Sequence, residues 1–209
     1  MTEDPDASAP RGAPATGFVH SALDVQTRES IDGGVLQLDV EDILELLPHR
    51  PPQLLLDRVL SLVPGVHAVG LKVVTGNELG LATRKHGFVF PATFALEAVL
   101  QLARIVHHYP RRFGRRPDAG AKGRSPRIDP PSVSGMADVF AVDSFEVARE
   151  MLVGDRLFIS VSLLGRDDGD PAAPSGIITR GVGNVHLAGE PYIDTSFRLI
   201  DARLTSHDR

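Results

Sequence analysis

Glu97 is the residue whose type and setting point most directly to chemistry. It stands between Leu96 and Ala98 in an otherwise apolar stretch, Phe94–Ala103. Removing a carboxyl group from water favours its protonated form, which can donate a proton in general acid catalysis. Gln101 follows four residues later, so on a helix the two side chains share one face. Gln101 can therefore hydrogen-bond Glu97 or a bound ligand. The alternative is that Glu97 lies on the helix face that meets solvent and that Gln101 is structural.

A second proton-transfer group would complete such a site, and His86 stands eleven residues before Glu97, in the segment that precedes the predicted helix. The chain has no cysteine, which excludes thiolate metal sites and cysteine nucleophiles. No histidine–carboxylate spacing is typical of a metal site, and no glycine-rich phosphate loop joins a strand to a helix. We therefore expect no metal and no cofactor. Four other histidines are expected to be structural: His49, His107, His108 and His186.

The chain has 209 residues, of which 42% are hydrophobic and 23% charged, as expected for one globular domain. Residues 1–34 are acidic and rich in Ala, Pro and Gly, so we expect a disordered tail followed by a single domain at 35–204. A basic, proline-rich insertion is expected at 110–135. Neither a signal peptide nor a membrane span is predicted, which favours a cytoplasmic location.

Hydrophobic periodicity and turn residues predict one long helix among several strands. Pro91 precedes this helix and Thr93 can cap it, whereas Tyr109-Pro110 is expected to end it. The helix is apolar on nearly all faces, so a sheet must wrap around it. The predicted elements are a short helix at 43–47, strands at 54–62 and 67–75, an irregular segment at 77–89, the long helix at 93–108, and strands at 139–148, 156–164, 177–187 and 192–200.

Several segments together resemble one enzyme family. They are Asp-Ile-Leu-Glu-Leu-Leu-Pro-His-Arg at 42–50, Leu-Leu-Leu-Asp-Arg-Val-Leu at 54–60, Val-Thr-Gly-Asn-Glu at 74–78 and Leu-Glu-Ala-Val-Leu-Gln at 96–101. This pattern resembles the 3-hydroxyacyl-acyl-carrier-protein dehydratases of bacterial fatty-acid synthesis, over roughly residues 40–107 and 137–200. The resemblance implies an α+β hot-dog fold, a curled antiparallel β-sheet wrapped around one long helix. It also implies a dimer with active sites between the protomers.

The resemblance implies a loop histidine as base and a helix carboxylate as acid, and Glu97 matches the carboxylate. The family carries Gly-His-Phe-Pro-Gly before the helix, with its histidine fourteen positions ahead of the carboxylate. Counting from Glu97 reaches Thr83, and counting from Asn77-Glu78 reaches Arg84, so this loop is one residue short. His86 is then the displaced candidate base. The residues expected to bind substrate are Phe90, Ala92, Thr93 and Gln101.

Three functions follow from the resemblance and from the altered loop. The first is dehydration of 3-hydroxyacyl thioesters of an acyl carrier protein, in fatty-acid or polyketide-type biosynthesis. The second is a catalytically degenerate subunit that binds acyl thioesters or pairs with an active homologue. A hot-dog thioesterase, in which Glu97 activates water, is a weaker third.

The expected partners are an acyl carrier protein and a second hot-dog subunit, in a homodimer or a heterodimer. We expect neither nucleic-acid nor membrane binding, because the chain outside 111–127 is acidic and few aromatic residues are present. The seven bases of that segment fit either a docking patch for an anionic carrier protein or a solvated loop, and the solvated loop is the favoured interpretation.

Overall fold

A computed structural model of the chain describes residues 36–78, 80–84, 87–113, 138–166 and 177–201, all within a compact unit that spans Gly34–Arg209. Its longest helix is α3, and most of the other described residues lie in strands. The elements are β1 (Leu36–Leu38), α2 (Val40–Leu46), β2 (Arg58–Val63), β3 (His67–Val73), β4 (Ala82–Arg84), β5 (Gly87–Phe90), α3 (Ala92–Phe113), β6 (Asp138–Val147), β7 (Met151–Leu152), β8 (Arg156–Arg166), β9 (Ile177–Leu187) and β10 (Glu190–Asp201).

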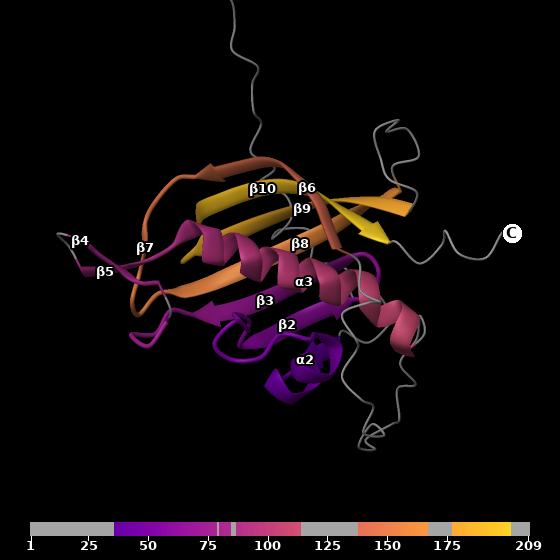
Figure 1. Ribbon diagram of the computed structural model, residues 1–209, viewed down its shortest axis with the longest axis horizontal. Helices are drawn as coiled ribbons and strands as arrows, with labels where there is room; N and C mark the ends of the chain where they lie inside the picture. Colours follow the sequence, from indigo (N-terminus) through magenta and orange to yellow (C-terminus); the bar gives the residue numbers. More distant parts are fainter. Residues whose placement is uncertain (1–35, 79, 85–86, 114–137, 167–176, 202–209) are drawn as a thin grey trace, which may run out of the picture. The chain divides into compact units, whose positions relative to one another are not determined.

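The main sheet has seven antiparallel strands in the order β1-β2-β3-β8-β9-β10-β6, and it curls around α3 (Figure 1). A separate antiparallel sheet has the order β4-β5-β7. The expected α+β architecture, a curled sheet around one long helix, is therefore confirmed, and it is the hot-dog fold that the resemblance implies. The wrapping follows from the sequence, because a helix with apolar residues on most faces is stable only when it is enclosed.

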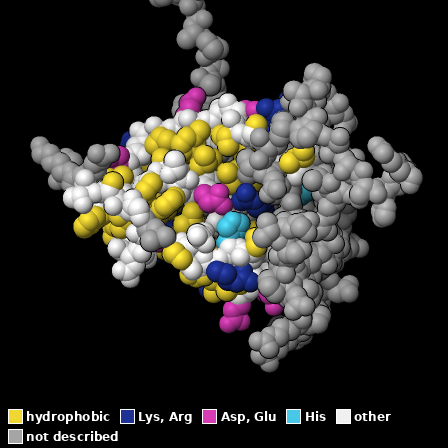
Figure 2. Space-filling view, viewed as in Figure 1, with side chains coloured by type: hydrophobic (Ala, Val, Ile, Leu, Met, Phe, Trp, Pro, Cys, Tyr) yellow, Lys and Arg dark blue, Asp and Glu magenta, His cyan; other side chains and the backbone are white. Residues whose placement is uncertain are grey.

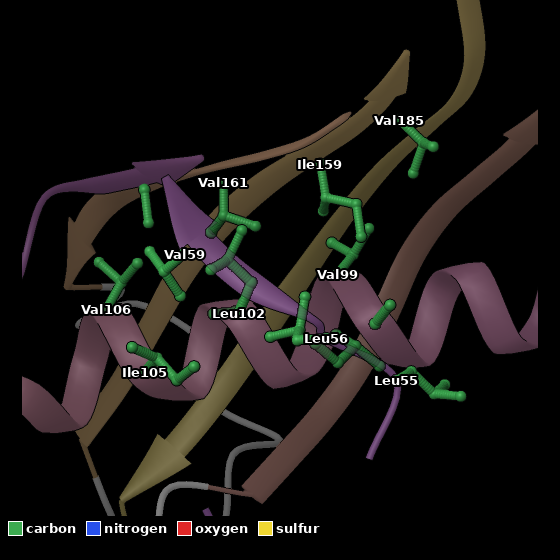
Figure 3. Close-up of a cluster of buried hydrophobic side chains, with 14 of the residues drawn as sticks. Leu55, Leu56, Val59, Val99, Leu102, Ile105, Val106, Ile159, Val161 and Val185 are labelled. Atoms are coloured by element: carbon green, nitrogen blue, oxygen red, sulfur yellow. The ribbon is translucent and has the colours of Figure 1, made fainter. Parts of the chain in front are cut away.

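The core lies between α3 and the concave face of the sheet. Side chains of α3 and of the strands interdigitate there, and many of them are completely buried (Figure 3). Gly183 of β9 permits the close approach, because a Cβ built at this position would lie 2.3 Å from Cγ1 of Val99 on α3. The labelled members of the cluster are Leu55, Leu56, Val59, Val99, Leu102, Ile105, Val106, Ile159, Val161 and Val185.

Helix α3 does not end before Pro110 as predicted but continues through it to Phe113. Proline has no N–H, so the carbonyl of Val106 loses its usual helical partner. The N–H of Gly65, in the turn between β2 and β3, donates to this carbonyl at 2.9 Å. Gly65 has a φ of +76°, which favours glycine there. The insertion expected from residue 110 is thus helical as far as Phe113, and 114–135 lie outside the described residues.

Helix α2 begins at Val40, after an acidic N-cap residue, Asp39. The Asp39 side chain accepts hydrogen bonds from the N–H groups of Glu41 (2.9 Å) and Asp42 (3.1 Å), and the Asp42 carboxylate accepts from Asp39 N–H (3.1 Å). This reciprocal capping box fixes the first turn of a helix. The cap starts the helix three residues earlier than its apolar residues alone predicted.

The strand predictions are close in the C-terminal half, where β9 has the predicted bounds Ile177–Leu187. The prediction of a strand over 54–62 was wrong at its start, since β2 begins at Arg58. The reason is that Leu55 N–H donates to a side chain on α3 rather than to a neighbouring strand. The segment 77–89, predicted to be irregular, contributes the antiparallel strands β4 and β5. The short strands β1 and β7 were also not predicted.

The acidic tail predicted over 1–34 lies outside the described residues and stays a prediction. Within the described ranges, no helix combines the length and the apolar character needed to cross a membrane.

The close contact between Gly183 and Val99 predicts that Gly183→Ala destabilises the fold. A methyl group has no space there, and overpacking a well-packed core typically costs about 1–3 kcal/mol. Chemical denaturation of the purified variant measures the change in free energy of unfolding. Gly76→Ala is the matched control, because a Cβ at Gly76 meets no atom within 4 Å. Equal stability of the two variants would show that β9 can shift away from α3 at little cost.

Candidate active site

Glu97 lies in the second turn of α3 and is the centre of a polar cluster. Its Oε1 accepts hydrogen bonds from Gln101 Nε2 and from Arg104 Nη1, both at 3.2 Å. His49 Nε2 lies 3.5 Å from the same oxygen. The Glu97 side chain is 36% exposed, whereas that of Arg104 is 14% exposed. Three nitrogen atoms therefore converge on one oxygen of a partly exposed carboxylate.

The apolar sequence neighbours of Glu97 predicted a desolvated carboxyl group, whereas the side chain is only partly buried. Leu96 and Ala98 are adjacent in sequence but lie on other faces of the helix. Residues four and seven positions later share the face of Glu97, and these are Gln101 and Arg104. The Glu97–Arg104 spacing of seven is two helical turns, a signal that sequence analysis missed.

The Gln101 side chain fixes the position of Glu97 relative to the segment at 53–55. This side chain is fully buried. Its Oε1 accepts from Leu55 N–H at 3.0 Å, and its Nε2 donates to the Gln53 carbonyl at 2.8 Å as well as to Glu97. Each of these partners is a protein group, so the amide ties α3 to the 53–55 segment. The expectation that Gln101 contacts substrate is not supported, because the side chain has no exposed surface in this chain; the predicted bond to Glu97 is present.

His49, predicted to be only structural, lies directly beside Glu97. It follows α2 in the Pro48-His49-Arg50 segment, and Arg50 Nη1 braces that segment by donating to the carbonyls of Leu47 and His49, both at 2.8 Å. Burial lowers the pKa of His49, with Arg104 and Arg50 adding to the effect and Glu97 opposing it. The imidazole is therefore mostly neutral at neutral pH. Its Nδ1 is buried without a hydrogen-bond partner among the described residues.

The start of α3 lies one turn before Glu97. Pro91, not Thr93, provides the cap, because the Pro91 carbonyl accepts from Phe94 N–H (3.0 Å) and from Ala95 N–H (3.3 Å). The helix begins at Ala92, and Thr93 is exposed. The N–H groups of Ala92 and Thr93 are then first-turn donors that have no hydrogen-bond acceptor among the described residues.

Phe90 was expected to bind substrate, but its side chain is fully buried and packs edge-to-face on Phe94 with ring centroids 5.9 Å apart. A large aromatic ring gains more from such burial than from exposure at a site. Phe90 therefore belongs to the core under the start of α3, and the expectation of a direct substrate contact is not supported.

The segment before α3 is a β-hairpin. Thr83 pairs with Phe88 and Arg84 with Gly87, so both positions that the family histidine could occupy lie in β4. The hairpin projects beyond the beginning of α3 (Figure 1). His86 connects the two strands together with Lys85 and lies outside the described residues, so its position relative to Glu97 stays a prediction.

The cluster opens on the face of α3 opposite the sheet. In Figure 2, an acidic, a basic and a histidine side chain lie together near the middle of that face, among hydrophobic side chains. Among the described residues, no group of three or more His, Asp or Glu side chains is placed to bind a metal ion. The arrangement can hold a carboxylate in a fixed orientation next to an apolar surface, which suits proton transfer to an acyl substrate.

The sequence of the chain is similar to those of known 3-hydroxyacyl-[acyl-carrier-protein] dehydratases. The chain is 36% identical over 128 residues to 3-hydroxyacyl-[acyl-carrier-protein] dehydratase FabZ of Herpetosiphon aurantiacus, a match that covers 60% of this chain and 77% of the relative. It is 30% identical over 161 residues to the FabZ dehydratase of an Anaeromyxobacter species, covering 77% and 87%. No family model matches the chain.

Among solved structures, the dehydratase heterocomplex ApeI:P from Xenorhabdus doucetiae is similar with a TM-score of 0.54 and 16% identity. This likeness covers 78% of the chain and 92% of that structure. It supports the fold alone.

The lowered pKa values of His49, which is partly buried, and His67, which is buried, predict that stability falls in mild acid. Burial lowers the pKa of both His49 and His67 below 6.5, so the unfolded state binds more protons than the folded state as pH falls. Their contribution is constant above about pH 7 and is lost progressively below pH 6.5. Urea unfolding at about pH 7.5 and about pH 5.5 measures this loss. His67→Gln should reduce the difference between the two pH values, and an unchanged difference in both single Gln variants would contradict the assignment.

Proposed function

Because the chain belongs to the family of FabZ 3-hydroxyacyl-[acyl-carrier-protein] dehydratases, we propose that it dehydrates 3-hydroxyacyl thioesters carried by an acyl carrier protein. The observation that carries this proposal is the placement of Glu97, a carboxylate on the open face of the long helix, held by the buried amide of Gln101. Such a fixed and partly exposed carboxylate is what proton transfer at an acyl chain requires. The reaction class is a hydro-lyase.

The dehydration removes a proton from the carbon next to the thioester carbonyl and releases the 3-hydroxyl group as water. Negative charge develops on the thioester oxygen, and preorganised N–H donors stabilise it. The N–H groups of Ala92 and Thr93, at the positive end of the α3 dipole, are the donors that we propose for this oxygen. Glu97 is five residues further on, about 7–8 Å along the helix axis. That interval leaves space for a thioester between the amides and the carboxylate.

His86 remains the histidine that the family resemblance implies as a base. It stands three residues after Thr83 and two after Arg84, the two positions that align with the family histidine. Those two residues are occupied in strand pairing. A base at His86 would have to act from the connection between β4 and β5.

The strand pairing of Thr83 and Arg84 favours one second candidate function. A subunit whose loop has become a hairpin can keep the acyl-binding surface while a partner supplies the histidine. Under this alternative the chain forms a heterodimer with an active hot-dog homologue, whereas the dehydratase proposal is compatible with a homodimer. An acyl carrier protein is the expected substrate carrier in both cases.

Turnover of a 3-hydroxyacyl carrier-protein substrate by the purified chain tests the proposal. Glu97→Gln should lower the dehydration rate roughly 10²- to 10⁴-fold, the usual contribution of a positioned acid or base. Glu190→Gln is a matched control, because Glu190 forms an exposed ion pair with Arg149 at the start of β10. Its rate should equal that of the unmodified chain.

Three other outcomes separate the alternatives. Absence of turnover, or an unchanged rate in Glu97→Gln, would overturn the dehydratase proposal. Binding of the acyl carrier protein without turnover, restored by a second hot-dog subunit, would support the degenerate subunit. Release of a free thiol would indicate a thioesterase.

A further inference from the structure

Arg104 has more hydrogen-bond donors than its contacts use. Its Nη1 donates to Glu97 Oε1 at 3.2 Å, whereas an arginine side chain carries five N–H groups. The guanidinium forms no other hydrogen bond with the described residues. The side chain is 14% exposed, and none of its nitrogen atoms is both fully buried and without a partner. The unused N–H groups of Arg104 are therefore accessible to solvent beside the carboxylate.

The guanidinium lies where the outer part of a bound acyl chain would run. In the proposed reaction the thioester oxygen lies at the N–H groups of Ala92 and Thr93, and C3 lies at Glu97, five residues further along α3. The carbons beyond C3 then continue in the same direction, away from Ala92. Arg104 comes seven residues after Glu97, and its side chain points back along the helix to reach that carboxylate. The guanidinium is therefore just beyond the reacting carbons.

Apolar side chains border this part of the open face of α3. Leu96, Leu100 and Arg104 follow at four-residue intervals and form one row on the helix. Hydrophobic side chains surround the polar cluster in Figure 2. The neighbouring polar groups are already engaged, because His49 Nε2 is 3.5 Å from the Glu97 carboxylate and Arg50 donates to two backbone carbonyls. Arg104 is the member of this cluster with donors to spare.

Resting on the dehydratase function proposed above, we propose that Arg104 determines substrate specificity by selecting 3-hydroxyacyl chains that carry a second oxygen atom at C5. This oxygen, of a hydroxyl or a carbonyl group, accepts a hydrogen bond from an Arg104 N–H that Glu97 does not use. The acid and base roles that the family resemblance implies are unchanged. Such substrates are supplied by two-carbon chain extension after an incompletely reduced unit, because oxygen then remains on alternate carbons.

The selection follows from the cost of covering a guanidinium. An alkyl chain at this place would displace the water that solvates the unused N–H groups and would offer no acceptor in return, which is unfavourable. An oxygen at C5 replaces that water with a charge-assisted hydrogen bond, which is stronger than a neutral one. A site that offers a buried donor discriminates well against an analogue that lacks the matching oxygen. Position C5 fits, because Arg104 contacts the same carboxylate that meets the oxygen on C3.

The test compares two substrates of equal length on the same acyl carrier protein, 3-hydroxyhexanoyl and 3,5-dihydroxyhexanoyl. Formation of the enoyl product gives kcat/KM for each substrate. The unmodified chain should prefer the 3,5-dihydroxy substrate roughly 10- to 100-fold, the range that a hydrogen bond to a charged group provides. Arg104→Met, which keeps an unbranched side chain without donors, should abolish this preference. Because both substrates react at C2 and C3, any effect of the variant on Glu97 itself cancels in the ratio.

Arg198→Met is the matched control. Arg198 forms another partly buried ion pair, with Asp143 at 2.8 Å on the β6–β10 strand pair, so the variant makes the same chemical change away from α3. The ratio of the two kcat/KM values should equal that of the unmodified chain. Thermal unfolding of both variants checks that the fold is retained.

The outcomes separate this inference from the proposed function. Dehydration of both substrates with equal kcat/KM, or a preference that persists in Arg104→Met, would overturn the role of Arg104 and leave the dehydratase function standing. If neither substrate is dehydrated, the dehydratase function is overturned, and the dissociation constants of the two acyl carrier proteins are compared instead. Tighter binding of the 3,5-dihydroxy form that is lost in Arg104→Met would still support the inference. Equal binding would overturn it as well.

Discussion

The buried amide of Gln101 is the interaction on which the site depends. A fully buried amide must find hydrogen-bond partners, because an unsatisfied one costs about 1–3 kcal/mol. Gln101 meets this requirement by bonding to the backbone of Gln53 and Leu55 and to the carboxylate of Glu97. The segment that follows α2 is thereby fixed against the middle of α3. His49 and Glu97 lie together because one side chain holds both of their elements.

Much of the fold could be predicted from the sequence, because local patterns determine it. The apolar surface of 93–108 required an enclosing sheet, and alternating apolar and polar residues predicted strands such as β8. The continuation of α3 through Pro110 could not be predicted, since it depends on a donor from Gly65, forty-five residues earlier in the chain. The predicted start of β2 was wrong for a similar reason, because the Leu55 N–H donates to the side chain of Gln101, which is distant in the sequence.

The candidate site was predictable only in part. Glu97 and its bond to Gln101 follow from helical spacing, and the same rule applied two turns further would have found Arg104. The position of His49 depends on tertiary packing between the segment after α2 and α3, so no local pattern could have revealed it. The sequence shows that the loop before α3 is one residue shorter than the family pattern. It does not show that this segment folds into the paired strands β4 and β5.

The hydrogen bond from Gly65 to Val106 also fixes where the chain leaves the helix. Because α3 continues to Phe113, the chain leaves the helix about 24 Å along the axis from Glu97, at 1.5 Å per residue. The basic residues that follow therefore join the domain at the far end of the helix from Ala92. A ligand anchored near this exit would have to extend along most of α3 to reach the first-turn N–H groups at Ala92, so the length of the helix sets a minimum distance between these two points.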